Sequence, residues 1–119
     1  MLGASKNAYQ SLIKLVDSNK NLHSFENGES ILLLADAITG SKTLLTTLTD
    51  SGISPEARAG VAKDVLAKIG TNDAVSLISE AVKMRWSQTQ DLVQGLEASG
   101  ARALSVSYTH LTLPTILRV

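Results

Sequence analysis

Apolar residues recur with a helical period over the first hundred residues of the chain. The clearest repeat consists of Ala57, Val61, Val65 and Ile69. Four-residue spacing predicts a helix over Ser54 to Gly70 that buries this stripe, which Ala62 and Leu66 widen. Its ends are marked as well: Ser54 can accept hydrogen bonds from the first free amides, Pro55 suits the first helical position, and Gly70 can take a left-handed conformation after the last turn.

The same pattern predicts five further helices: Ser5 to about Asn19, Phe25 to Thr39, Ser41 to about Thr47, Thr71 or Asn72 to about Arg85, and Ser87 to about Gly100. Ser87-Gln88-Thr89-Gln90 has the form of a capping box, which would start the last of them at Ser87. No pair of alternating strands occurs before residue 104. We therefore predict an all-α fold, a six-helix bundle forming one domain over residues 1–104.

The last fifteen residues, 105–119, have a different pattern. Their β-branched, alternating residues are typical of a strand, but a lone strand after six helices would have no partner. The run from Val106 to Thr115 resembles the translated sequence of a transposase adapter used to prepare sequencing libraries. We therefore expect residues 105–119 to be an adapter-derived tail that forms no domain, and the genuine subunit to continue differently after Leu104.

Composition removes several classes of function. The 119 residues contain no cysteine, which excludes a disulfide scaffold, a thiolate metal site and a cysteine nucleophile. Basic and acidic residues number 11 each, and without the tail they number 10 and 11. This balance argues against a dedicated nucleic-acid backbone binder. The longest apolar stretch, Ile31 to Ala35, is far too short to span a bilayer, so we expect a soluble intracellular protein.

Candidate chemistry is sparse. His23 has no second histidine or carboxylate cluster near it at metal-ligand spacing, and no nucleophile elbow, phosphate loop or dinucleotide fingerprint occurs. We predict no catalytic residues, no metal and no cofactor. Trp86 could anchor a partner or fill the junction between the last two helices, and its place directly before Ser87 favours the structural role.

Two predicted helices carry apolar arcs broader than one packing contact requires. These arcs contain Tyr9, Leu12, Ile13 and Val16 in the first helix and Val75, Ile78 and Val82 in the fifth. Side by side, the two helices could form a groove for an amphipathic partner helix. The alternative is that the bundle's own core uses both arcs.

Several segments resemble one known family. They are Met1 to Lys6, Ser54 to Gly60, and Arg85-Trp86-Ser87 followed by Asp91-Leu92-Val93 and Leu96-Glu97. Together they are similar to the delta subunit of F-type ATP synthase, the relative of the mitochondrial oligomycin-sensitivity-conferral protein, in its actinobacterial form. The resemblance covers residues 1–104 and implies the six-helix N-terminal domain of that family.

This resemblance implies a non-catalytic stator subunit of the peripheral stalk, at the cytoplasmic face of the cell membrane, that supports proton-driven ATP synthesis. Its implied partners are the N-terminal helix of an alpha subunit and, through a C-terminal domain missing here, the membrane-anchored b subunits. In the family the alpha helix docks on helices one and five, which implies an alpha-binding role for the seven residues of the two arcs. On this basis Ile78→Asp is expected to abolish binding of an alpha N-terminal peptide.

One departure and one competing interpretation stand beside the resemblance. The family usually has an arginine shortly before the first tyrosine, whereas this chain offers only Lys6 before Tyr9. The competing interpretation is a small nucleic-acid-binding or regulatory module of helix-turn-helix type. A salt-dependent interaction with duplex DNA would support that module, and the stator interpretation expects none.

Overall fold

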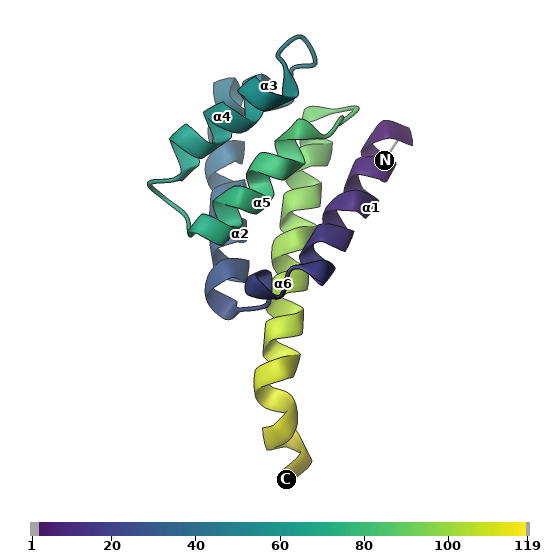
Figure 1. Ribbon diagram of the computed structural model, residues 1–119, viewed down its shortest axis with the longest axis vertical. Coiled ribbons are helices and arrows are strands. Elements are labelled where there is room, and N and C mark those ends of the chain that lie inside the picture. Colours follow the sequence, from purple (N-terminus) through teal and green to yellow (C-terminus); the bar gives the residue numbers. More distant parts are fainter. Residues whose placement is uncertain (1–2, 119) are drawn as a thin grey trace.

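The computed structural model describes residues 3–118, with side chains described for 3–107, and these residues form six α-helices and one 3₁₀ turn. The elements are α1 (Gly3–Ser18), η1 (Lys20–Leu22), α2 (Phe25–Thr39), α3 (Lys42–Leu48), α4 (Pro55–Leu66), α5 (Asn72–Lys83) and α6 (Thr89–Arg118). No strand occurs in this range. The predicted all-α, six-helix architecture is confirmed (Figure 1).

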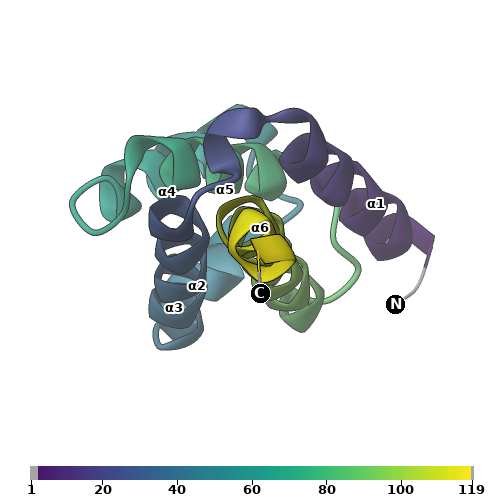
Figure 2. The ribbon, with the colours of Figure 1, turned by 90° about the horizontal axis from the view of Figure 1, so that it is seen from below.

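The helices are arranged around α6. α6 packs most extensively on α2 and also lies along α1, while α5 packs mainly on α4. Seen from below, α6 lies between α2 on one side and α1 on the other, with α4 and α5 above it in the view (Figure 2). α5 also contacts α1, α2 and α6, so it meets neighbours on most of its circumference.

Hydroxyl caps fix where four of the helices begin. The side chains of Ser24, Ser41, Ser54 and Thr71 each accept a hydrogen bond from the backbone amide three residues later. A hydroxyl at this position satisfies an amide that has no partner inside the helix. The predicted starts at Ser41, at Ser54 with Pro55 following, and at Thr71 are therefore confirmed.

A partly buried polar network, built on the buried side chains of Asn27 and Ser30, holds the start of α5 against α2. The Thr71 hydroxyl donates to Oδ1 of Asn27 at 2.5 Å, and the Thr71 amide donates to the Ser30 hydroxyl at 2.9 Å. Asn27 Nδ2 in turn donates to the carbonyl of Asn21 at 2.6 Å. Because a buried polar group costs free energy unless it is paired, this network favours one position of α5 relative to α2.

The predicted burial of α4 is only partly right: Ala62 and Leu66 of the predicted stripe are buried, but its main four-residue repeat is not. The structure buries Ala59, Ala62 and Leu66 against α5, whereas Val65 and Ile69 are 43% and 57% exposed. The small alanine side chains let α4 approach α5 closely. This close packing favours burial of the alanine face over burial of the more apolar stripe that contains Val65 and Ile69. The end of α4 is also wrong: the helix stops at Leu66, and no glycine of the described residues has a positive φ, Gly70 included.

The last helix starts later and ends later than predicted. It begins at Thr89, and the amide of Ser87 donates to the Ser5 hydroxyl at 2.6 Å, so the predicted capping box is wrong. It also continues past Gly100 to Arg118, so the end predicted near Gly100 and the strand-like pattern after Ser105 do not describe its backbone. That residues 105–119 derive from an adapter stays a prediction, and residue 119 and the side chains of 108–118 lie outside what is described.

Gly100 lies inside α6 because α2 approaches it closely. A Cβ at Gly100 would stand 2.6 Å from Cδ2 of Leu32 and 3.2 Å from the backbone carbonyl oxygen of Gly28. The missing side chain therefore sets the distance between the two helices that make the largest contact in the bundle.

We predict that Gly100→Ala destabilises the chain by about 1–3 kcal/mol, because overpacking costs more than the roughly 1 kcal/mol that alanine gains in helix propensity. Urea denaturation followed by circular dichroism measures this difference. Gly60→Ala is the matched control, since Gly60 is also helical and has nothing within 4 Å of its ideal Cβ position. Equal stabilisation by both replacements would contradict the close α2–α6 contact.

Among the described residues no single helix is long and apolar enough to cross a membrane, and only the bent pair α2 and α3, which meet at 106°, meets that test together.

Candidate functional site

The predicted site lies where α1 runs beside α5. The beginning of α1 lies at the end of α5 (Figure 1), because Ser5 is fully buried and its hydroxyl accepts the amide of Ser87 in the α5–α6 connection. Among the helices, α1 makes its larger contact with α6 and a smaller one with α5. The two helices are thus neighbours, with their ends tied by one long-range hydrogen bond.

The structure places most of the predicted binding residues inside the bundle. Five of the seven are buried, and these are Leu12, Val16, Val75, Ile78 and Val82. Four neighbouring helices pack on α5 and cover its broad apolar arc. The bundle's own core therefore uses this arc, which is the alternative that the sequence pattern left open. The predicted effect of Ile78→Asp therefore needs correction: Ile78 has no exposed surface, so this change tests the core and not a docking surface.

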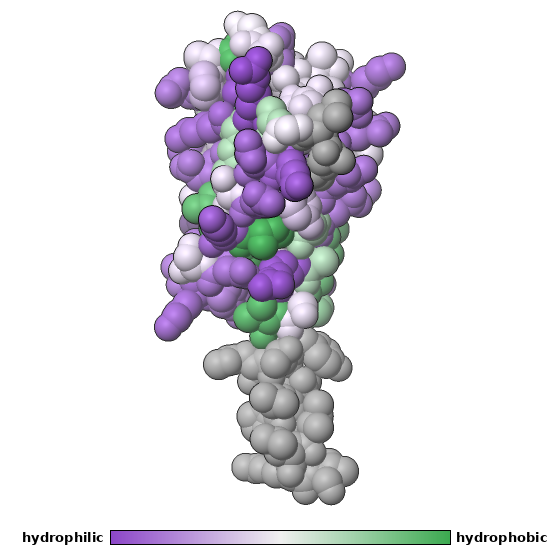
Figure 3. Space-filling view, turned by 90° about the vertical axis from the view of Figure 1, so that its right-hand side faces the viewer, coloured by the Kyte–Doolittle hydropathy of each residue, from purple (hydrophilic) through white to green (hydrophobic). Residues whose placement is uncertain are grey.

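The other two predicted residues, Tyr9 and Ile13, are half-buried. They are four residues apart on α1 and so lie on the same side of the helix. Met84, directly after α5, is half-buried too, and both Tyr9 and Met84 pack against the core. We call Tyr9, Ile13 and Met84 the α1–α5 rim. On the side of the molecule where α1 lies, a limited apolar area shows between hydrophilic side chains (Figure 3).

Trp86 has the structural role that the sequence favoured. Its side chain is 7% exposed, and its indole N–H donates to the carbonyl of Ala81 at 2.8 Å. A Cβ at Gly95 would stand 2.8 Å from the indole ring, so α6 passes directly over it. The ring therefore joins the end of α5 to α6.

Arg58 is a buried residue whose importance the sequence reasoning missed. Its Nε donates to the carbonyl of Val82 at 2.8 Å, and Nη1 donates to the carbonyls of Asp50 and Ile53. The guanidinium thus joins the last turn of α5 to the loop after α3. The only signal in the sequence is its place next to Ala59 on the small-residue face of α4, which is the face that α5 covers.

Arg85 was predicted in the last turn of the fifth helix, but α5 ends at Lys83. Arg85 lies instead in the connection to α6, where it is exposed. Together with Arg58 it lines a cavity at this end of the bundle. Ser87, outside the helix it was predicted to start, lines this cavity as well.

The remaining polar candidates form no reactive cluster. His23 is half-buried, with Nε2 2.7 Å from the carbonyl oxygen of Val16. No group of three or more histidine, aspartate or glutamate side chains within the described residues could hold a metal ion. Glu80 and Lys83 form an exposed ion pair at 3.5 Å.

A second ion pair, between Asp17 and Arg102, joins α1 to α6. Arg102 donates from Nε and Nη2 to the two carboxylate oxygens of Asp17, at 2.8 and 3.1 Å. The hydrogen bond to Asp17, and then its negative charge, raises the pKa of Arg102 above its ordinary value. Because both side chains are about half exposed, we assign this pair little stability.

Comparison with known proteins gives a consistent set of relatives. The chain is 30% identical over 110 residues to the ATP synthase subunit delta of Corynebacterium urealyticum, covering 87% of this chain and 40% of that protein. It is 34% identical over 104 residues to the ATP synthase subunit delta of Streptomyces coelicolor, covering 82% of this chain and 36% of that protein. A third, from a Parafrankia strain, is 34% identical over 70 residues, covering 59% of this chain and 25% of that protein.

No protein-family model and no solved structure matches the chain. The relatives nevertheless agree in name and in bacterial group with the resemblance found in the sequence, and the chain spans less than half of their length. We conclude that this chain belongs to the family of ATP synthase delta subunits, of which it represents a part.

Proposed function

We propose that the chain is the alpha-binding part of a non-catalytic peripheral-stalk subunit of an F-type ATP synthase. The observation that carries this proposal is its similarity to actinobacterial delta subunits over most of its length. In this role it joins the catalytic head to the membrane-anchored b subunits, at the cytoplasmic face of the membrane. The contact with the b subunits belongs to the part of the delta subunit that this chain does not include.

The proposed role needs stiffness and not reactive groups. A stalk that resists the torque of a rotor must transmit force through packed helices. The Asn27–Thr71 hydrogen bond joins α2 to α5, the Arg58 contacts join α4 to the end of α5, and the Ser5–Ser87 hydrogen bond joins α1 to the connection after α5. Such cross-links support a body in which α1 and α5 keep a fixed relative position.

Docking of an alpha-subunit helix beside α1 would use the α1–α5 rim. A partner helix laid along α1 can cover the exposed parts of Tyr9 and Ile13, while Leu12 and Val16 behind them support the rim from the core. Removing apolar surface from water contributes roughly 25 cal/mol per Å². We therefore propose that Tyr9 and Ile13 contact the alpha subunit directly, and that the five buried residues act by holding the rim in place.

Binding of a peptide that copies the alpha-subunit N-terminus tests this function. We expect Ile13→Asp to weaken binding at least tenfold in isothermal titration calorimetry, because a carboxylate in the contact would lose water without gaining a partner. Ser11→Asp is the matched control: it adds the same charge to α1 at an exposed position on the opposite side of the helix.

Circular dichroism must show both variants folded. Equal affinity of the two variants and the unaltered chain would contradict docking at the rim. A complete absence of binding by the unaltered chain would contradict the alpha-binding role itself.

A further inference from the structure

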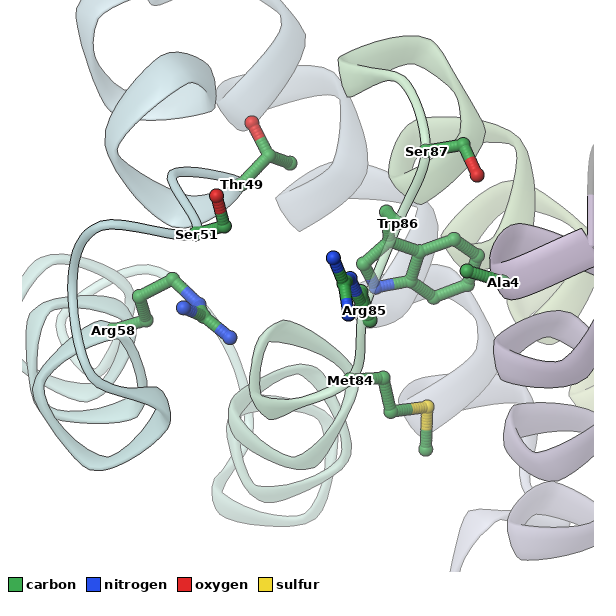
Figure 4. A pocket seen from close by; sticks show the side chains of 8 residues that line it. All are labelled: Ala4, Thr49, Ser51, Arg58, Met84, Arg85, Trp86 and Ser87. Atoms are coloured by element: carbon green, nitrogen blue, oxygen red, sulfur yellow. The ribbon is translucent and has the colours of Figure 1, made fainter.

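A cavity with an unusual charge lies at the end of the bundle where α1 begins. Its volume is about 430 Å³, and it lies between the loop after α3, the start of α1, α4 and the α5–α6 connection. The polar side chains that line it are Thr49, Ser51, Arg58, Arg85 and Ser87 (Figure 4). It therefore contains two guanidinium groups and three hydroxyls, with no aspartate or glutamate among its lining residues.

The charge of Arg58 is held in place without being neutralised. Arg58 is 6% exposed, and its four hydrogen bonds all go to backbone carbonyls, the last from Nη2 to Lys83 at 3.4 Å. A guanidinium has five N–H donors, so one on Nη2 remains. Neither of the two ion pairs within the described residues involves Arg58. A buried cation whose acceptors are all neutral keeps its full positive charge.

Arg85 adds a second cation with no partner. It makes no hydrogen bond or ion pair with any residue that the structure describes. In Figure 4 the Arg58 guanidinium points away from α4, toward the side of the cavity where Arg85 lies. Two like charges on one cavity repel each other, and an anion bound between them would attract both and so offset that repulsion.

The end of α5 offsets only part of this charge. A helix C-terminus carries about half a negative charge, and Arg58 already occupies the carbonyls of Val82 and Lys83 there. The balance in the cavity therefore stays positive. Ser51 and Ser87 add hydroxyls that can donate to an oxygen ligand.

We propose that this cavity binds an oxyanion, which Arg85 contacts directly and the remaining Nη2 hydrogen of Arg58 fixes from inside. Guanidinium groups pair with planar carboxylates and with phosphates through two parallel hydrogen bonds. The ligand is a carboxylate, supplied by an acidic side chain of a bound protein, or a free phosphate. The site adjoins the α1–α5 rim, with which it shares Met84, but its polar lining belongs to other residues and it does not depend on the proposed alpha-subunit contact.

Two titrations of the ¹⁵N-labelled 119-residue chain test the proposal, one with sodium phosphate and one with sodium acetate, at ionic strength held constant with chloride. We expect at least one anion to cause saturable shifts of the Trp86 indole and Ser87 amide resonances and of the Arg58 and Arg85 Nε–H resonances. Saturation by acetate alone assigns the site to carboxylates, and saturation by phosphate alone assigns it to phosphates. Saturation by both identifies a general oxyanion site.

Charge variants decide whether the cavity is responsible. Arg85→Gln should weaken the apparent affinity at least tenfold, whereas Lys63→Gln, which removes the same charge from an exposed position of α4 outside the cavity, should change it less than twofold. Arg58→Lys keeps the buried positive charge but loses the planar guanidinium with its paired N–H donors. If this variant is folded, we expect it to bind the anion more weakly. Non-saturable shifts with both anions, or equal weakening by Arg85→Gln and Lys63→Gln, would overturn the proposal.

Discussion

Ile78→Asp is expected to unfold most of the chain rather than to disturb one surface. Ile78 has no exposed surface and lies in the middle of α5, the helix that contacts α1, α2, α4 and α6. The change removes a buried apolar side chain and places a carboxyl group among apolar neighbours, which together cost about 4 kcal/mol or more. That is a large fraction of the roughly 5–15 kcal/mol by which small domains are stable. Thermal and urea unfolding followed by circular dichroism measure the loss.

The control for this experiment is Ser76→Asp, two residues earlier on α5 and exposed. It should change the free energy of unfolding by less than about 0.5 kcal/mol. A buried carboxyl group has a raised pKa in the folded state, so the penalty of Ile78→Asp should increase as the pH rises above about 4. A folded Ile78→Asp variant with unchanged stability at pH 7 would contradict the placement of α5 in the core.

Trp86→Ala is expected to cost about 3–5 kcal/mol, the range for removing a large aromatic side chain from a core. The ring fills the space between the end of α5 and α6 at Gly95, and its indole N–H satisfies the carbonyl of Ala81. The cavity left behind would loosen α6 at the point where its first turns meet α5. Urea denaturation gives the difference in the free energy of unfolding.

Trp86→Phe separates packing from hydrogen bonding. It keeps most of the ring but leaves the Ala81 carbonyl without its indole donor, so we expect a loss of about 1–3 kcal/mol, smaller than that of Trp86→Ala. If Trp86 were instead an exposed anchor for a partner, both variants would keep nearly full stability. That result would contradict the structural role.

The number of helices and most of their starts could be predicted because the signals are local. A serine or threonine before a helical repeat satisfies free amides within three residues, as Ser41, Ser54 and Thr71 do. The role of Trp86 could also be predicted from its place between two helices. These features depend on neighbours in the sequence and not on the way the helices are assembled.

The burial of individual faces could not be predicted, because it depends on which helix becomes a neighbour. The stripe ending at Val65 and Ile69 is the more apolar face of α4, but α5 packs on the alanine face. The exposed stripe instead lines a groove of about 450 Å³ with Leu44 of α3. For the same reason the broad arc of α5 indicated a docking surface, although its four neighbours cover Ile78 and Val82.

Arg58 and Gly100 show a second limit of pattern reading. An arginine in the middle of a helix is usually solvated, and a glycine usually weakens a helix. Here Arg58 is buried because four carbonyls from other elements surround its guanidinium. Gly100 stays helical because Leu32 and the backbone of α2 occupy the space of a side chain. Both outcomes depend on contacts between residues distant in the sequence.

Chemical-shift mapping of the labelled chain with an alpha N-terminal peptide tests the central claim most directly, because it reports where the peptide binds as well as whether it binds. The account predicts saturable shifts concentrated on the exposed side of α1 around Tyr9 and Ile13 and at Met84 after α5. Shifts confined to the α3–α4 groove around Val65 and Ile69, or no shifts at saturating peptide, would contradict it.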